Sequence, residues 1–362
     1  MRRIIKVTAK ALSIPLKSPF KTALRVVNAL NDICVRIETD CGIIGFGEAP
    51  PTTAITGETV NSILSAINEH IAPKITGRSA EDFEDLIETV QQSMVKNTSA
   101  KAAVDMALYD IRAQALNLPL YRLLGGSIRT LENDLTISLN DTSRMISDSL
   151  DAVENGFKIL KVKVGKTGVS DAGLILEIRR AIGSGIELRV DANQGWTPKE
   201  SVRIIKALED SGCGVSLVEQ PVNAYDLDGL RFVTQNVATP ILADEAVFSP
   251  RDAINIIRTG SADMINIKLM KTGGIREALK ICDIADTYKI PCMMGCMLES
   301  RLSISAAVHL ATARRVITMV DLDGPLLCAS DPFTGGPSFS GPSITLTDEP
   351  GIGVRYEEGN KR

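Results

Sequence analysis

Histidine, aromatic residues and paired cysteines are scarce in this sequence. Of its 362 residues, two are histidines, one is a tryptophan and 4% are aromatic. His70 and His309 fall in helical patterns and neighbour no obvious catalytic partner, so an enzyme built on this chain is expected to use Lys, Asp, Glu, Tyr or Cys as its base. The seven cysteines are scattered and never spaced as CxxC. This pattern predicts reduced thiols in a cytoplasmic protein rather than a disulfide scaffold.

Long apolar runs and an excess of positive charge are also missing. No run approaches the roughly 18 residues that suggest a membrane helix, and no signal-peptide core follows the basic N-terminus. Lys and Arg total 40 and Asp and Glu total 44, which leaves a net charge of -4. A mildly acidic chain has no long-range attraction for nucleic acids or anionic membranes, so we expect neither as a partner.

The first 126 residues predict a small α+β domain. Residues 4–16 alternate like a strand, and residues 32–49 form a hairpin pattern that turns at Asp40-Cys41-Gly42. Apolar residues at helical spacing follow in three segments, at 58–75, 79–94 and 99–117. Strands followed by helices are typical of an α+β domain, which we place at residues 1–126.

A different rhythm begins after Gly126. Short apolar strand patterns recur roughly every 22–30 residues, and a helical pattern follows each of them. Eight strands with seven intervening helices predict a closed (β/α) barrel over residues 127–325. An open doubly wound sheet is the weaker alternative, because no GxGxxG follows the first strand of either half. Residues 326–362 are rich in Gly, Pro and Ser, carry one strand pattern at 343–348, and are expected to return to the first domain.

Charged residues stand at the ends of six predicted barrel strands, where catalytic residues gather in such barrels. They are Lys161, Lys163, Asp191, Glu219, Asp244, Lys268, Asp321 and Asp323. Asp191, Glu219 and Asp244 come from three consecutive strands, and neighbouring strands lie about 4.8 Å apart, so their carboxylates can converge. Because converging carboxylates need a cation, and because no His or Cys joins them, we predict a Mg²⁺ or Mn²⁺ site. Such an ion keeps positions open for substrate oxygens, and a substrate carboxylate would suit them.

Lysines are predicted on two sides of the same barrel mouth. Lys161 and Lys163 are two residues apart and share a face, whereas Lys268 arises about four strands further on. A carboxylate held by a divalent cation has a more acidic α-carbon, and the enediolate left after proton removal can be stabilised by the cation and by Lys161. If one lysine removes the α-proton and the other returns a proton to the opposite face, the result is epimerisation or racemisation.

These segments resemble the enolase superfamily, and within it the muconate-lactonizing subgroup. The matching segments are KVKVG at 161–165, DANQGW at 191–196, VEQP at 218–221, ADE at 243–245 and NIKLMKTGG at 266–274. The resemblance implies a modified (β/α)7β barrel of TIM type with an α+β capping domain that the tail rejoins. It also implies Lys163 and Lys268 as the acid/base pair, Mg²⁺ on Asp191, Glu219 and Asp244, and a homo-oligomer.

The last predicted strand narrows the resemblance to the dipeptide epimerases. Asp321 and Asp323 place two carboxylates on one face, which suits a substrate ammonium group. The stretch PFKTALRVV with Arg25 resembles the L-Ala-D/L-Glu epimerases, where Arg25 would meet the side-chain carboxylate of Glu. The same resemblance implies the remaining substrate contacts, which are Thr136, Lys161, Cys296 and Leu298. Cys296 stands where a Ser is expected in that group, and this difference can change which substrate side chain is preferred.

The sequence therefore predicts Mg²⁺-dependent epimerisation of a dipeptide, L-Ala-D-Glu to L-Ala-L-Glu, by 1,1-proton transfer. One alternative is a dipeptide epimerase with hydrophobic or cationic side-chain specificity, although Arg25 would repel a cationic side chain. A cycloisomerase or an N-acylamino acid racemase on the same scaffold is another alternative, but its substrate lacks the amine that would explain Asp321 and Asp323. A barrel that only binds an acidic ligand would have no use for lysines on opposite faces.

Overall fold

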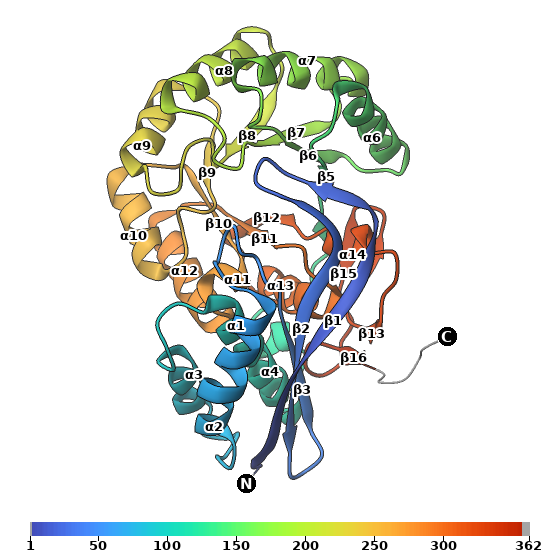
Figure 1. The fold of residues 1–362 in the computed structure, drawn as a ribbon, viewed down its shortest axis with the longest axis vertical. Helices are drawn as coiled ribbons and strands as arrows, with labels where there is room; N and C mark the ends of the chain where they lie inside the picture. Colours follow the sequence, from blue (N-terminus) through green and yellow to red (C-terminus); the bar gives the residue numbers. More distant parts are fainter. Residues whose placement is uncertain (1, 357–362) are drawn as a thin grey trace.

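The computed structural model describes residues 2–356 and has two connected parts, a capping domain and a parallel barrel (Figure 1). Met1 of the predicted α+β domain and residues 357–362 of the predicted tail lie outside the described residues. In Figure 1 the capping domain, drawn mainly in blue and teal, lies on one side of the ring of barrel strands and helices.

The capping domain opens with an antiparallel three-stranded sheet. Its strands are β1 (Ile4–Lys21), β2 (Val26–Thr39) and β3 (Ile44–Ala49), in the order β1-β2-β3. The β2–β3 turn lies where the sequence predicts it, with Gly42 at φ 84° donating its N–H to the carbonyl of Thr39. Strand β1 is longer than expected, because it continues past a bulge between Pro15 and Phe20 and carries the β1–β2 hairpin towards the barrel. There, Nζ of Lys21 donates to Oδ1 of Asn140 at 2.7 Å.

Helices cover one face of this sheet. They are α1 (Val60–Ser65), the π-helix η1 (Ala66–Ile71), α2 (Ala72–Ile75), α3 (Phe83–Gln91), α4 (Thr98–Ala115) and α5 (Leu120–Leu123). The helix expected over 58–75 is thus interrupted. Pro73 has no N–H and its ring crowds the carbonyl four residues earlier, and the turn before it widens into the π-helix. Helix α4 lies so close to β3 that a Cβ on Gly45 or Gly47 would collide with α4 backbone oxygens.

Eight parallel strands form the barrel and confirm the predicted fold class. They are β5 (Leu135–Ile137), β6 (Ile159–Lys163), β7 (Glu187–Asp191), β8 (Val215–Glu219), β9 (Ile241–Ala243), β10 (Met264–Ile267), β11 (Cys292–Gly295) and β12 (Ile317–Asp321). Each strand pairs with the next in chain order. The seam between β12 and β5 is joined by a bridge between Asn133 and Val320 and by the Leu322 N–H, which donates to Oδ1 of Asn133. The doubly wound alternative is therefore wrong.

Seven helices connect these strands on the outside of the barrel. They are α6 (Thr142–Glu154), α7 (Asp171–Ile182), α8 (Pro198–Asp210), α9 (Leu227–Asn236), α10 (Pro250–Thr259), α12 (Ile275–Tyr288) and α13 (Arg301–Ala313), with the short α11 (Leu269–Thr272) and the 3-10 turn η2 (Gly168–Ser170) between them. Local sequence sets their starts: Thr197 caps α8 and Ser249 caps α10, each followed by a proline at the first helical position. Within residues 2–356, none of the helices combines the length and the apolar composition that crossing a bilayer would need.

The tail contacts both parts of the molecule. After α14 (Gly324–Leu327), β13 (Phe333–Gly335) pairs with β16 (Val354–Tyr356). The strand β15 (Ser343–Thr345) pairs with β14 (Ser338–Ser340) on one side and with β4 (Leu131–Glu132) on the other. The Ala329 N–H donates to the Pro15 carbonyl of the capping sheet, and Oγ of Ser305 in α13 donates to the carbonyl of Ile352. The strand predicted at 343–348 is observed as β15.

Candidate active site

The carboxyl ends of the barrel strands bring the sequence-predicted charges together. Lys163, Asp191 and Glu219 end β6, β7 and β8, and their Cα atoms are partners in the β-ladders. Asp244 directly follows β9, and Lys268 directly follows β10. Because strands in a barrel are staggered in a regular way, these side chains share one layer at one mouth.

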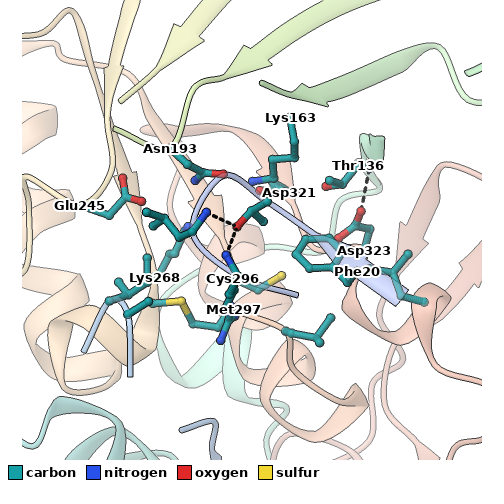
Figure 2. A pocket seen from close by; sticks show the side chains of 17 residues that line it. Phe20, Thr136, Lys163, Asn193, Glu245, Lys268, Cys296, Met297, Asp321 and Asp323 are labelled. Atoms are coloured by element: carbon teal, nitrogen blue, oxygen red, sulfur yellow. Dashed lines mark hydrogen bonds between the residues drawn. The ribbon is translucent and has the colours of Figure 1, made fainter. Parts of the chain in front are cut away.

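A small cavity of about 60 Å³ opens at this mouth (Figure 2). The predicted residues that line it are Arg25, Thr136, Lys163, Lys268, Cys296, Leu298, Asp321 and Asp323. The other predicted residues, Lys161, Asp191, Glu219 and Asp244, do not line it and are at most 1% exposed. Phe20 and Ile55 of the capping domain close the cavity. Small-molecule pockets usually measure roughly 300–1,000 Å³, so this cavity is small, and the capping domain is one of the parts that limit its size.

Ion pairs connect the lysines to the carboxylates. Nζ of Lys161 lies 2.6 Å from Oδ2 of Asp321, 2.7 Å from Oε2 of Glu219 and 3.2 Å from Oδ2 of Asp191. Nζ of Lys163 lies 2.6 Å from the same Asp191 oxygen. Lys161 is thus the common cation beneath the cavity, and Lys163 stands at its edge.

A second lysine pair holds the third carboxylate. Nζ of Lys268 lies 2.6 Å from Oδ2 of Asp244, and Nζ of Lys271 lies 2.6 Å from Oδ1. Burial by itself would lower the pKa of Lys268, but Asp244 and Glu219 outweigh it and hold that pKa well above its ordinary value. Lys268 follows β10 and Lys163 ends β6, which lie four positions apart in the eight-stranded barrel, so the two ammonium groups approach the cavity from different sides.

Buried carboxyl groups outnumber buried ammonium groups around the cavity. The strand ends and the turns after them carry seven buried carboxyls and four buried lysines, which are Asp191, Glu219, Asp244, Glu245, Glu299, Asp321, Asp323, Lys161, Lys163, Lys268 and Lys271. Burial, and then the charge of Asp191, raises the pKa of Glu219 to about 7. Burial, and then the charge of Asp244, raises the pKa of Glu245 to about 8. A divalent cation among these carboxyls would counter both effects, because it favours their ionised forms.

The donor set fits an oxygen-preferring cation, although the side chains are not yet arranged around one. In the described part of the chain, no three His, Cys, Asp or Glu side chains are placed so that they could hold a metal ion. Ammonium groups stand between the carboxylates instead, as Lys161 does between Asp191 and Glu219. Both carboxylate oxygens of Glu245 are buried without a hydrogen-bond partner. Oxygen donors without imidazole or thiolate suit Mg²⁺ or Mn²⁺ rather than Zn²⁺.

Asp321 and Asp323 form an acidic pair at one end of the cavity. The Thr136 N–H donates to Oδ2 of Asp323 at 2.8 Å, which Figure 2 shows as a dashed line. Burial, and then the charge of Asp321, raises the pKa of Asp323 to about 6. Two buried carboxyls that repel each other offer a favourable place for an ammonium group.

Arg25 stands on the capping-domain side of the cavity. It follows a tight turn in which Oγ1 of Thr22 accepts hydrogen bonds from the N–H groups of Leu24 and Arg25, at 3.1 and 3.3 Å. Burial lowers the pKa of Arg25, and Asp32 partly offsets this effect. The guanidinium remains charged at neutral pH and can pair with a carboxylate.

Sequence reasoning missed several residues of this site. Glu245 and Asn193 line the cavity, and Lys271 is a fully buried cation beside Asp244. Glu245 follows Asp244 directly, but only the turn after β9 decides that both carboxyls face inward. The signal that could have identified Lys271 is its spacing of three residues from Lys268, which places both on one face of a helical turn.

Comparison with known families identifies both parts of the chain. Residues 4–125 match the family model described as mandelate racemase / muconate lactonizing enzyme, N-terminal domain. Residues 145–360 match the model described as enolase C-terminal domain-like.

Individual relatives are similar over almost their whole length. The chain is 53% identical to the L-Ala-D/L-Glu epimerase of Clostridium acetobutylicum, over 95% of this chain and 96% of that protein. The substrate-liganded L-Ala-D/L-Glu epimerase from Bacillus subtilis superposes with a TM-score of 0.96 at 48% identity, covering 97% of this chain and 98% of that one. The dipeptide epimerase from Enterococcus faecalis, complexed with Mg and L-Leu-L-Tyr, gives 0.94 at 41% identity, covering 98% and 100%.

Proposed function

Because the chain belongs to the mandelate racemase / muconate lactonizing enzyme family of the enolase superfamily, we propose that it is a dipeptide epimerase that interconverts L-Ala-D-Glu and L-Ala-L-Glu. One observation carries this proposal: Lys163 and Lys268 reach the same small cavity from β6 and β10, four strands apart. Two amines on different sides of one carbon can exchange its proton with inversion, whereas a single base tends to return the proton to the face that lost it.

The proposed chemistry is 1,1-proton transfer at the α-carbon of the second residue. Nζ of one lysine, in its neutral form, accepts the α-proton, and Nζ of the other, in its ammonium form, donates a proton to the opposite face. The reverse reaction exchanges these roles. Lys161, buried among three carboxylates, supplies a fixed positive charge for the negative charge that develops on the substrate carboxylate.

Asp191, Glu219 and Asp244 are the residues that would hold Mg²⁺, which acidifies the α-carbon of a carboxylate substrate and offsets negative charge. Mn²⁺ accepts the same oxygen ligands. The family structures with bound Mg support the choice of Mg²⁺, as does the buried excess of negative charge in this chain.

The two ends of the cavity support a dipeptide substrate with an acidic second residue. Asp321 and Asp323 would bind the N-terminal ammonium group, and Arg25 would pair with the side-chain carboxylate of Glu. Thr136, Cys296 and Leu298 would contact the substrate between these ends. Asp321 already pairs with Lys161, but Asp323 forms no salt bridge with the described residues, and a cycloisomerase or N-acylamino acid racemase substrate would bring it no cation, so both alternatives are disfavoured.

A dipeptide library in D₂O with Mg²⁺, analysed by mass spectrometry, tests this function. We expect deuterium at the α-carbon of the second residue, with L-Ala-L-Glu and L-Ala-D-Glu among the fastest substrates. Preference for hydrophobic second residues would favour the alternative specificity, and exchange in N-acylated amino acids alone would overturn the dipeptide assignment.

Two further expectations accompany the proposal. We place the protein in the cytoplasm, since all seven cysteines are free thiols in the structure and reduced thiols are typical of that compartment. Homo-oligomerisation, which the family resemblance implies, stays a prediction that a sedimentation measurement can test.

A further inference from the structure

A capping-domain carboxylate caps a barrel helix across the boundary between the two parts. Glu48 of β3 is fully buried and accepts three hydrogen bonds at the start of α13. Its Oε1 accepts from the Ser300 N–H at 2.9 Å, and its Oε2 accepts from Oγ of Ser300 at 2.6 Å and from the Ser303 N–H at 2.9 Å. A carboxylate at a helix N-terminus is stabilised both by these charge-assisted bonds and by the helix dipole.

The segment held by Glu48 is the one that carries two cavity residues. Cys296 and Leu298 precede Ser300 by four and two positions, with no regular element between them and α13. Glu299 stabilises the same segment by a hydrogen bond within it, because its Oε1 accepts from the Met297 N–H at 2.5 Å. The position of Leu298 therefore depends on how the start of α13 is fixed.

On its other side, Glu48 contacts the strand that leads from Arg25. Asp32 of β2 is 2% exposed and lies beside Glu48 on the same face of the sheet. Burial, then the charge of Glu48 and a hydrogen bond with it, raise the pKa of Asp32 well above its ordinary value. The Glu48 carboxylate therefore favours the protonated form of Asp32, in which the carboxyl can donate to Glu48.

A second cavity is lined by residues from both sides of Glu48. It measures about 300 Å³, and Arg25, Asp32 and Leu298 all line it. Arg25 and Leu298 also line the candidate active site, so this second cavity continues from the end where the second side chain of a dipeptide would lie.

We propose that Glu48 is a positioning residue for side-chain specificity, which sets the separation between Arg25 and Leu298 by binding Asp32 on one side and Ser300 and Ser303 on the other. Glu48 touches no reacting atom in this scheme. It sets how well the cavity fits the acidic second residue, so this inference rests on the proposed dipeptide epimerase activity.

A second interdomain cap offers a matched control. Oδ1 of Asp105 in α4 accepts from the Ile275 N–H at 2.6 Å, so a capping-domain carboxylate also caps α12. Asp105 is fully buried, as Glu48 is, but it lines neither cavity. Asp105→Asn should therefore destabilise the domain contact without changing which side chain is preferred.

The experiment compares kcat/KM for L-Ala-L-Glu and for L-Ala-L-Leu in wild type, Glu48→Gln, Asp32→Asn and Asp105→Asn. Glu48→Gln keeps one acceptor oxygen and replaces the other with an NH₂ group, so the backbone N–H of either Ser300 or Ser303 loses its acceptor. A buried donor left without an acceptor disturbs the start of α13, so we expect the preference for L-Ala-L-Glu to fall about tenfold, mainly through KM. Asp32→Asn keeps a donor to Glu48 and should preserve the preference, as should Asp105→Asn.

An equal loss for both substrates in Glu48→Gln would mean that Glu48 only stabilises the fold, and would overturn the proposal. If wild type turns over no dipeptide, the proposed function fails, and amide hydrogen exchange decides this inference instead. Faster exchange in Glu48→Gln confined to residues 22–32 and 296–303 would support the connection. Faster exchange throughout the capping domain would contradict it.

Discussion

Lys163 and Asp191 are Cα partners across the β6–β7 ladder, and Nζ of the lysine lies 2.6 Å from Oδ2 of the aspartate. A proposed proton carrier is therefore bound to a proposed cation ligand. If Asp191 held a cation, its carboxylate would attract Lys163 less strongly, and the ammonium group of Lys163 would be free to turn to the substrate. Lys268 and Asp244 form an equivalent ion pair, with Nζ of the lysine 2.6 Å from Oδ2 of the aspartate.

Replacing either candidate proton carrier should stop epimerisation without preventing cation binding. We expect Lys163→Ala and Lys268→Ala each to lower kcat by about 10²–10⁴-fold, the usual contribution of a positioned acid or base. Proton NMR in D₂O measures the rate, and calorimetric titration with Mg²⁺ measures binding. Near-full activity in either variant would contradict the two-base scheme.

Mg²⁺ should raise the melting temperature of the wild-type protein, because it offsets the buried excess of negative charge. Glu219→Gln removes one of these charges and one ligand, so its melting temperature should respond less to Mg²⁺. Differential scanning calorimetry with and without EDTA measures both effects and does not depend on catalysis. An equal response in the two proteins would argue against Glu219 as a ligand.

Asp323→Asn should lower kcat/KM for dipeptides far more than for N-acylated amino acids. The free amine of a dipeptide loses a charge-assisted contact worth about 1.5–3 kcal/mol, which corresponds to roughly a 10–100-fold loss in kcat/KM. An N-acylated substrate carries no such amine, so it serves as the control. A similar loss for both substrate types would rule out the amine-binding role.

Arg25→Ala should reduce kcat/KM for L-Ala-L-Glu about tenfold more than for L-Ala-L-Leu, since only the first substrate has a side-chain carboxylate. Competition between the two dipeptides in one reaction measures the ratio directly. Arg25→Lys, which keeps the charge but not the forked geometry, should restore part of it. An unchanged ratio of the two kcat/KM values in Arg25→Ala would show that Arg25 does not recognise the substrate side chain.

His309 should make the fold sensitive to acid. Burial lowers the pKa of His309 to about 4, from an ordinary value of 6.5, and its Nδ1 accepts a hydrogen bond from the Tyr121 N–H. Between pH 6.5 and 4 the unfolded chain binds more protons than the folded one. The stability present above pH 6.5 is therefore lost as the pH falls through this range, by about 3 kcal/mol.

Asp110 must be separated from this effect, because burial raises its pKa to about 6 and its contribution has the opposite sign in the same range. Chemical denaturation of wild type and His309→Asn from pH 4 to 8 makes the comparison. The asparagine keeps an acceptor for Tyr121 but binds no proton, so the difference in unfolding free energy should change between pH 4 and 6.5. A constant difference would contradict the prediction.

Local patterns in the sequence were sufficient to predict the barrel and most of the charged residues at its mouth. Alternation and helical spacing are properties of neighbouring residues, so the eight strands and their order could be recognised without long-range information. Charges such as Asp191 and Glu219 could be placed at one mouth because parallel strands of a barrel end on the same side. The family resemblance supplied Arg25, which composition and spacing alone leave as an ordinary loop residue.

Only the tertiary structure decided how distant segments meet. Glu48 and Ser300 are separated by about 250 residues, and no local periodicity relates a capping strand to the start of a barrel helix. Sequence reasoning does not single out Lys271, yet folding buries it against Asp244. Likewise, the small volume of the cavity depends on where the β1–β2 hairpin rests on the barrel. The sequence by itself determined which charges end the strands, because that depends on chain neighbours. Packing decided which of them pair, because ion pairs and helix caps between remote segments form only when burial brings them together.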